Sequence, residues 1–106
     1  MLGQSLGSFW ERGEKPGIVS CLEGVAGLFS RAGQADRAVR LFGVAARVRD
    51  DMGIPLPASE RLRHERYVAA TRAQLDEEAW QLEWEQGQAM TLEQAVEHAL
   101  RHSSEG

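Results

Sequence analysis

The chain has 106 residues, of which 42% are hydrophobic and 26% charged, and its formal net charge is -4 at pH 7. A chain of this length suits one domain that buries about two thirds of its unfolded surface. The negative charge argues against a nucleic-acid-binding surface, which needs a basic excess. Residues that favour helices are abundant and Val, Ile and Thr are few, so we expect an all-α protein.

Other features of the composition bear on location and chemistry. No apolar run approaches the roughly 18 residues of a membrane-spanning helix, and no basic-then-apolar leader opens the sequence. The single cysteine, Cys21, forms no internal disulfide, suits a reducing compartment and is interpreted as a small buried hydrophobe. We therefore expect a cytoplasmic protein that binds no membrane, and no cofactor or metal site is indicated.

Residues 1–15 form the first predicted helix, which ends near Gly13 and Pro16. In a repeat array, this segment is a half-repeat, the second helix of a preceding unit. Its apolar side then lacks a neighbour, so we predict that it joins two copies of the chain as a homodimer. The apolar residues on this side are Leu2, Leu6, Phe9 and Trp10.

Residues 16–53 are predicted to form two helices folded back on each other. Apolar and small residues fall three and four apart in each half, which gives each helix an apolar stripe. A turn centred on Gly33 joins the halves, and so short a connection forces antiparallel packing. The second helix should end at about Met52, where Gly53 takes the left-handed conformation.

The spacing in this hairpin matches a tetratricopeptide repeat. Ala26 and Ala38 let the two backbones approach, while Phe29 and Phe42 fill the space beside them. Asp50 stands where the repeat consensus has a proline. The remaining matching positions are Leu22, Val25 and Ala45. The charged residues of the second helix are interpreted as a solvated face: Asp36, Arg37, Arg40, Arg47, Arg49, Asp50 and Asp51.

Residues 59–102 are predicted to form C-terminal capping helices after a link broken by two prolines. Ser59 is expected to cap a helix that reaches about Leu75 and is basic at its start. An acidic helix follows from residue 76 or 77 to about residue 88. Thr91 and Gln94 have the spacing of a capping box, which begins a last helix over residues 92–102.

Several aromatic and histidine residues invite a functional interpretation. Trp80 and Trp84 lie four apart and share a helix face, where they are a core pair, the lining of a small-ligand pocket or a hot spot for a partner. His98 and His102 are also four apart but have no third ligand, so they are interpreted as a surface pair. His64 stands among arginines and is expected to be solvated. No catalytic cluster is apparent, so we do not expect an enzyme.

The order of these pieces resembles the C-terminal repeat region of large bacterial regulators of the LuxR-like or AfsR-like kind. The resemblance lies in residues 21–26, 40–45, 53–57, 75–80, 87–90 and 91–96. Such ATP-dependent transcriptional regulators couple an NTP-binding switch domain to tetratricopeptide-like repeats, often with a DNA-binding domain. The resemblance implies one domain over residues 1–106, a right-handed stack of about six helices. It implies a repeat arm that senses or docks, and a final pair of helices that caps the array. We interpret this arm as a non-catalytic regulatory module that binds a protein or peptide.

The inner surface of such a stack is a concave groove lined by the first helix of each hairpin. The candidate groove residues are Glu23, Ser30 and Arg31. A second, basic patch suited to an acidic peptide is formed by Arg61, Arg63 and Arg66.

Overall fold

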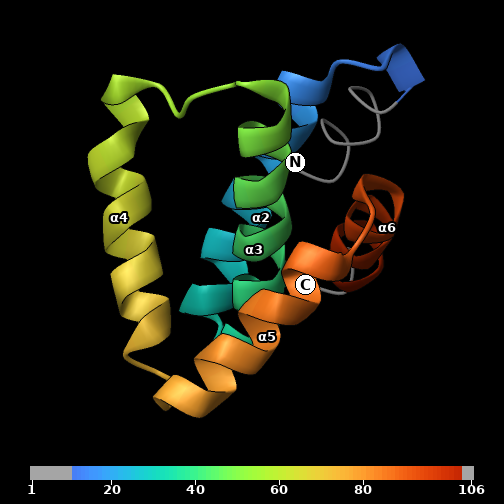
Figure 1. Cartoon of the computed structure of the whole chain (residues 1–106). Helices are drawn as coiled ribbons and strands as arrows, with labels where there is room; N and C mark the ends of the chain where they lie inside the picture. Colours follow the sequence, from blue (N-terminus) through green and yellow to red (C-terminus); the bar gives the residue numbers. More distant parts are fainter. Residues whose placement is uncertain (1–10, 104–106) are drawn as a thin grey trace.

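The computed structural model describes residues 11–103, and this part of the chain is helical with no strand (Figure 1). Its helices are α2 (Lys15–Arg31), α3 (Ala35–Met52), α4 (Ala58–Arg72), α5 (Glu77–Ala89) and α6 (Leu92–Ser103). The all-α prediction is confirmed for these residues. The predicted dimer contacts Leu2, Leu6, Phe9 and Trp10 lie outside them. No helix in the described part is long and apolar enough to cross a membrane.

The predicted hairpin is present as α2 and α3, which pack against each other along their length. Gly33, in the turn between them, has φ 79°, and Gly53 ends α3 with φ 65°, so both glycines occupy the left-handed region as expected. The four side chains of the packing prediction are all buried: Ala26, Phe29, Ala38 and Phe42.

Helix α3 is central, because α2 and α5 both pack closely against it while α4 and α6 touch α2 and α3 (Figure 1). Two glycines set the approach of α5. A Cβ atom built on Gly87 would collide with the backbone carbonyl of Arg40, and one on Gly43 would lie 2.9 Å from the carbonyl oxygen of Trp84. The crossing of α3 and α5 is therefore a backbone-to-backbone contact that only these small residues permit.

Helix α4 stands apart from α5, although the two are consecutive in the chain (Figure 1). Thr71 is the only buried residue of α4. The capping helices expected over residues 59–102 therefore do not form one close-packed hairpin; α4 and α5 each return to the central pair. The last helix, α6, adds Ala95, Val96 and Ala99 to the core.

Of the predicted N-terminal helix caps, one is confirmed and one is wrong. The capping box is confirmed, because Thr91 Oγ1 accepts from the Gln94 N–H at 3.0 Å while Gln94 Oε1 accepts from the Thr91 N–H at 2.9 Å. Asp76 caps α5 through a 2.7 Å bond from the Ala79 N–H. The prediction for Ser59 is wrong, since α4 begins at Ala58 with Pro57 in the capping position and no side-chain cap.

The solvated face predicted for the second hairpin helix is wrong for three of its arginines. Arg40 donates to both carboxylate oxygens of Glu83, at 3.0 and 3.2 Å, and Arg47 donates to the Gln88 carbonyl at 2.8 Å. Arg49 reaches back to α2 and pairs with Glu23. The long arginine stems lie along packed helices while their heads find acceptors on neighbouring elements.

Candidate functional site: the groove between α2 and α4

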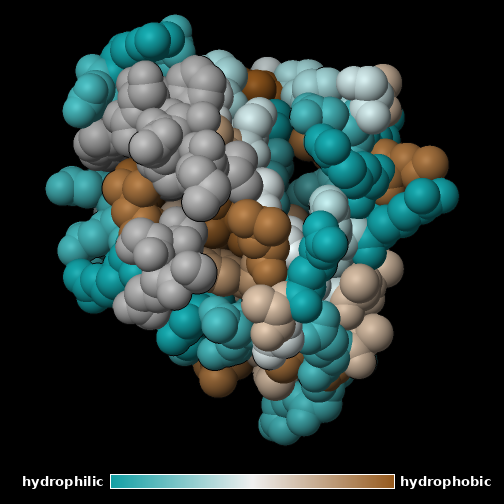
Figure 2. Space-filling view, turned by 180° about the vertical axis from the view of Figure 1, so that it is seen from behind, coloured by the Kyte–Doolittle hydropathy of each residue, from teal (hydrophilic) through white to brown (hydrophobic). Residues whose placement is uncertain are grey.

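Helices α2 and α4 touch at one end and diverge at the other. At the closed end, a Cβ on Gly27 would lie 3.5 Å from the ring of Tyr67, and Thr71 Oγ1 donates to Ser30 Oγ at 2.7 Å. Towards the start of both helices the gap opens into a groove of about 600 Å³. The surface is hollowed beside α4 when the molecule is seen from behind (Figure 2).

Most of the residues that face the groove from α2 are small. Cys21, Gly24 and Leu28 line it from α2, together with Gly17 and Ser20. The glycines carry no side chain to fill the space between the helices. The opposite wall is formed by Glu60, Arg63, His64 and Tyr67 of α4. Leu28 is 48% exposed, so an apolar side chain stands open to solvent at the edge of the groove.

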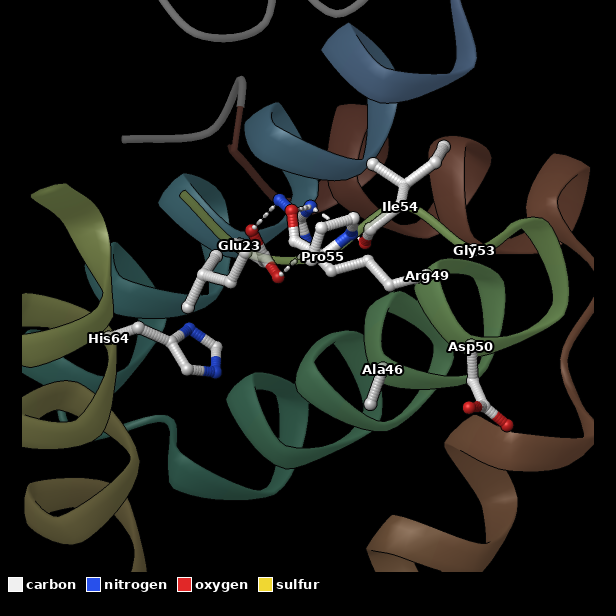
Figure 3. A pocket seen from close by; sticks show the side chains of 9 residues that line it. Glu23, Ala46, Arg49, Asp50, Gly53, Ile54, Pro55 and His64 are labelled. Atoms are coloured by element: carbon white, nitrogen blue, oxygen red, sulfur yellow. Dashed lines mark hydrogen bonds and ion pairs between the residues drawn. The ribbon is translucent and has the colours of Figure 1, made fainter. Parts of the chain in front are cut away.

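A second cavity of about 470 Å³ adjoins this groove beneath the link between α3 and α4 (Figure 3). It shares Glu23, Leu56 and His64 with the first and extends to Ala46 of α3. The two cavities together form one open depression that runs from α2 to the end of α3. The link over residues 53–57 forms its upper border.

An ion pair fixes this border. Arg49 and Glu23 form a two-pronged contact, with nitrogen–oxygen distances of 2.8 and 2.7 Å and side chains only 10% and 11% exposed (Figure 3). The Arg49 head also donates to the carbonyl oxygens of Ile54 and Pro55, at 3.4 and 3.2 Å. Hydrogen bonding to Glu23 raises the pKa of Arg49 above its ordinary value. One guanidinium therefore joins α2, α3 and the link that leads into α4.

His64 is not the solvated residue that its arginine neighbours suggest. Its ring is half-buried and meets Phe42 edge-on at 5.3 Å, pointing from α4 towards α3 (Figure 3). His98 likewise departs from the predicted surface pair, because it is half-buried and meets Phe29 edge-on at 6.2 Å. The side chain of His102 lies outside the described part of the chain.

The predicted groove residues occupy different environments. Glu23 lines the groove, but its carboxylate is engaged by Arg49. Ser30 is buried and accepts hydrogen bonds from Thr71 and Gln74, so it joins α2 to α4 and is not open to a partner. Arg31 is exposed at the end of α2. The structure brings only Glu23 and Arg63 to the groove; Arg61 and Arg66 are exposed elsewhere on α4.

Sequence reasoning did not assign Cys21, Leu28 and Tyr67 to a binding surface. The glycines of α2 were the available signal, because they recur on the side that faces α4. Cys21 is buried as expected, and its burial raises the pKa of the thiol.

The two tryptophans of α5 stack on each other at 5.7 Å with 17° between their rings. Trp80 is buried, and the guanidinium of Arg72 lies 5.3 Å from its ring centroid. Neither tryptophan lines either cavity described above. The pair thus contributes to the packing of α5.

Among the side chains that the structure describes, up to residue 101, no group of three His, Cys, Asp or Glu is arranged to hold a metal ion. No protein-family model matches the chain, and no significant match was found among curated proteins or among solved structures. The groove must therefore be interpreted from its own chemistry.

Proposed function

We propose that the chain is a non-catalytic protein–protein interaction module that holds a peptide segment of a partner between α2 and α4. In this proposal it is the tetratricopeptide-like C-terminal repeat arm of a bacterial transcriptional regulator or signal-transduction ATPase. The observation that carries the proposal is the open groove of about 600 Å³ with a glycine-containing floor and an exposed leucine at its edge.

The shape of the groove favours a peptide over a small molecule. Pockets for small molecules enclose most of the ligand surface, about 70–90% of it. This groove is closed where Tyr67 meets Gly27, opens towards the start of both helices and is bordered by one helix on each side, which leaves room for a peptide segment between the helices. An apolar side chain of the partner would cover Leu28 and remove its exposed surface from water. Glu60 and Arg63 supply polar groups along the rim.

The polar residues of the groove support binding more than catalysis. A reactive cysteine needs a stabilised thiolate, whereas burial raises the pKa of Cys21 and favours the neutral thiol. The His64 ring packs against Phe42. Glu23 is held by Arg49. Each group that chemistry would require is already used in packing or pairing.

The groove is tested with peptides from a displayed random library selected on the purified protein. We expect selected peptides to bind in titration calorimetry, and Leu28→Arg to weaken that binding at least tenfold by placing a charged side chain over the groove. Met52→Arg is the matched control: Met52 is 43% exposed, close to the 48% of Leu28, but lies outside the groove, so binding should be unchanged. Selected peptides that bind Leu28→Arg as well as the unchanged protein would refute the groove assignment.

The regulatory part of the proposal has a separate test in the reading frame that encodes this segment. A phosphate-binding loop, Gly-x-x-x-x-Gly-Lys-Ser/Thr after a strand, encoded upstream in the same frame would support an NTP-binding switch protein. A complete upstream frame without such a loop would contradict the regulator assignment and leave the peptide groove untouched.

A further inference from the structure

We propose that the outer face of α4 docks on the outer face of α5 of a second copy of this chain. The two helices carry opposite charge, each exposes a leucine, and neither uses its outer face inside the molecule. This inference goes beyond the peptide groove and does not rest on it, because the groove lies on the inner side of α4.

Helix α4 offers a basic surface. It contains four arginines and two glutamates, and Thr71 is its only buried residue. Leu62 is 58% exposed, and Arg66, one helical turn further on, shares its side of the helix. Within residues 11–103, no ion pair involves Arg61 or Arg66. Seen from behind, the surface over α4 is mostly hydrophilic with an apolar spot at the edge (Figure 2).

Helix α5 offers the acidic counterpart. It contains four glutamates and no lysine or arginine. Its inner face, with Trp80, Glu83 and Gly87, is buried, whereas Leu82 is 56% exposed on the opposite side. Glu78 and Glu85 lie four before and three after Leu82, so they flank it on one face. The other two glutamates are paired with arginines, but no ion pair in the described residues involves Glu78 or Glu85.

The outer faces of α4 and α5 carry opposite charge, and each exposes a leucine. An exposed leucine bordered by an unpaired arginine meets an exposed leucine bordered by unpaired glutamates, so the contact would bury both leucines and neutralise both charges. Glu65 is the one carboxylate on the outer face of α4, and Arg61 and Arg66 outweigh it. Within one molecule the contact is not made, because both helices pack on α3 and the exposed Arg72–Glu77 pair, at 3.3 Å, is the ion pair that joins them.

Charge also selects a second copy over a nucleic acid as the occupant. The chain as a whole has a net charge of -4, so a polyanion attracted by α4 would be repelled by most of the remaining surface. The required acidic helix is present on the chain itself. A contact between two such helices falls in the small interface class, below about 1,200 Å², so the association should be weak and sensitive to salt.

Sedimentation velocity of the purified chain tests the proposal. At about 20 mM salt the average mass should rise with protein concentration, and at about 500 mM salt the association should weaken at least tenfold, because screening shortens the reach of exposed charges. Leu28→Arg should leave the association unchanged, which separates it from peptide binding in the groove.

Substitutions that reverse the charge on the outer face of α4 or of α5 test whether these two faces make the contact. Arg61→Glu with Arg66→Glu, and separately Glu78→Arg with Glu85→Arg, should each abolish self-association, whereas an equimolar mixture of the two variants should associate again. The matched control for the second variant is Asp36→Arg with Asp50→Arg, the same change of charge at exposed positions of α3, which should still associate. Circular dichroism verifies that each variant is folded.

Three results would each overturn the proposal. They are a monomer at every concentration in low salt, self-association that survives both reversals, and a mixture that stays monomeric while each variant is folded. The second result would point to a contact elsewhere, such as the apolar side predicted for residues 1–15.

Discussion

Helices α5 and α4 both pack against α3, but the two contacts are built differently. Helix α5 meets α3 backbone to backbone at Gly43 and Gly87. Polar groups close the same contact: Glu83 binds Arg40, and the Gln88 side chain donates to the Gly43 carbonyl at 2.7 Å. The close backbone approach and these hydrogen bonds together hold α5 against α3.

Helix α4 is attached at fewer points. Tyr67 rests on Gly27, Thr71 bonds to Ser30, and the His64 ring touches Phe42. The rest of the helix is largely exposed, with Thr71 as its one buried residue. Segments with few buried apolar contacts open at lower free energy than core segments. The comparison indicates that α5 belongs to the cooperative core, whereas α4 is expected to open at a lower free energy.

A glycine-to-alanine substitution in each of the two contacts tests the difference between α5 and α4 most directly. Gly87→Ala should lower the free energy of unfolding by about 3 kcal/mol, because the new Cβ collides with the Arg40 backbone. Gly27→Ala should change it by less than about 1 kcal/mol, since its Cβ would make ordinary 3.5 Å contact with the Tyr67 ring and alanine favours the helix. Urea denaturation measures both. Equal losses would show that α4 is packed as tightly as α5.

Loss of the ion pair between Arg49 and Glu23, which holds the link over residues 53–57, should lower the free energy of unfolding by a smaller amount. Glu23→Gln removes the charged acceptor of the nearly buried Arg49 and should cost about 2 kcal/mol, measured by urea denaturation. Glu60→Gln is the matched control, because its pair with Arg63 is exposed and should contribute less than about 1 kcal/mol. A Glu23→Gln variant as stable as Glu60→Gln would mean that the link is held by other contacts.

The smallest effect should be local to α4. Thr71→Val keeps the side-chain shape but removes the hydroxyl that donates at 2.7 Å towards Ser30, which should cost about 1 kcal/mol. Hydrogen exchange should then become roughly fivefold faster in α4, with little change in α3. A uniform loss of protection in both helices would place α4 within the cooperative core.

Sequence reasoning succeeded where the signals are local. The hairpin of α2 and α3 could be predicted because spacings of three and four residues determine which side chains are buried, and Ala26 and Phe42 lie where that spacing requires. The Thr91 and Gln94 cap was equally visible, since its partners are three residues apart. The left-handed Gly33 and Gly53 follow from the same short-range chemistry.

Prediction from the sequence failed where a residue's partner is distant in the chain. Arg40 and Glu83 are 43 positions apart, and no spacing rule links them, so the sequence alone predicts a solvated arginine. Ser30 was assigned to an open groove because its burial depends on where α4 lies. The groove itself lies between α2 and α4, and no local spacing rule indicates where α4 lies relative to α2.

The contact between Gly43 and Gly87 also bears on how α4 is attached. Because α5 cannot slide along α3 without a backbone collision, the short segment between α4 and α5 holds the far end of α4 in place. The tether from Arg49 to the link at Ile54 and Pro55 holds the near end. Both termini of α4 are therefore attached to other elements, so α4 is a helix supported at both ends and not a free arm.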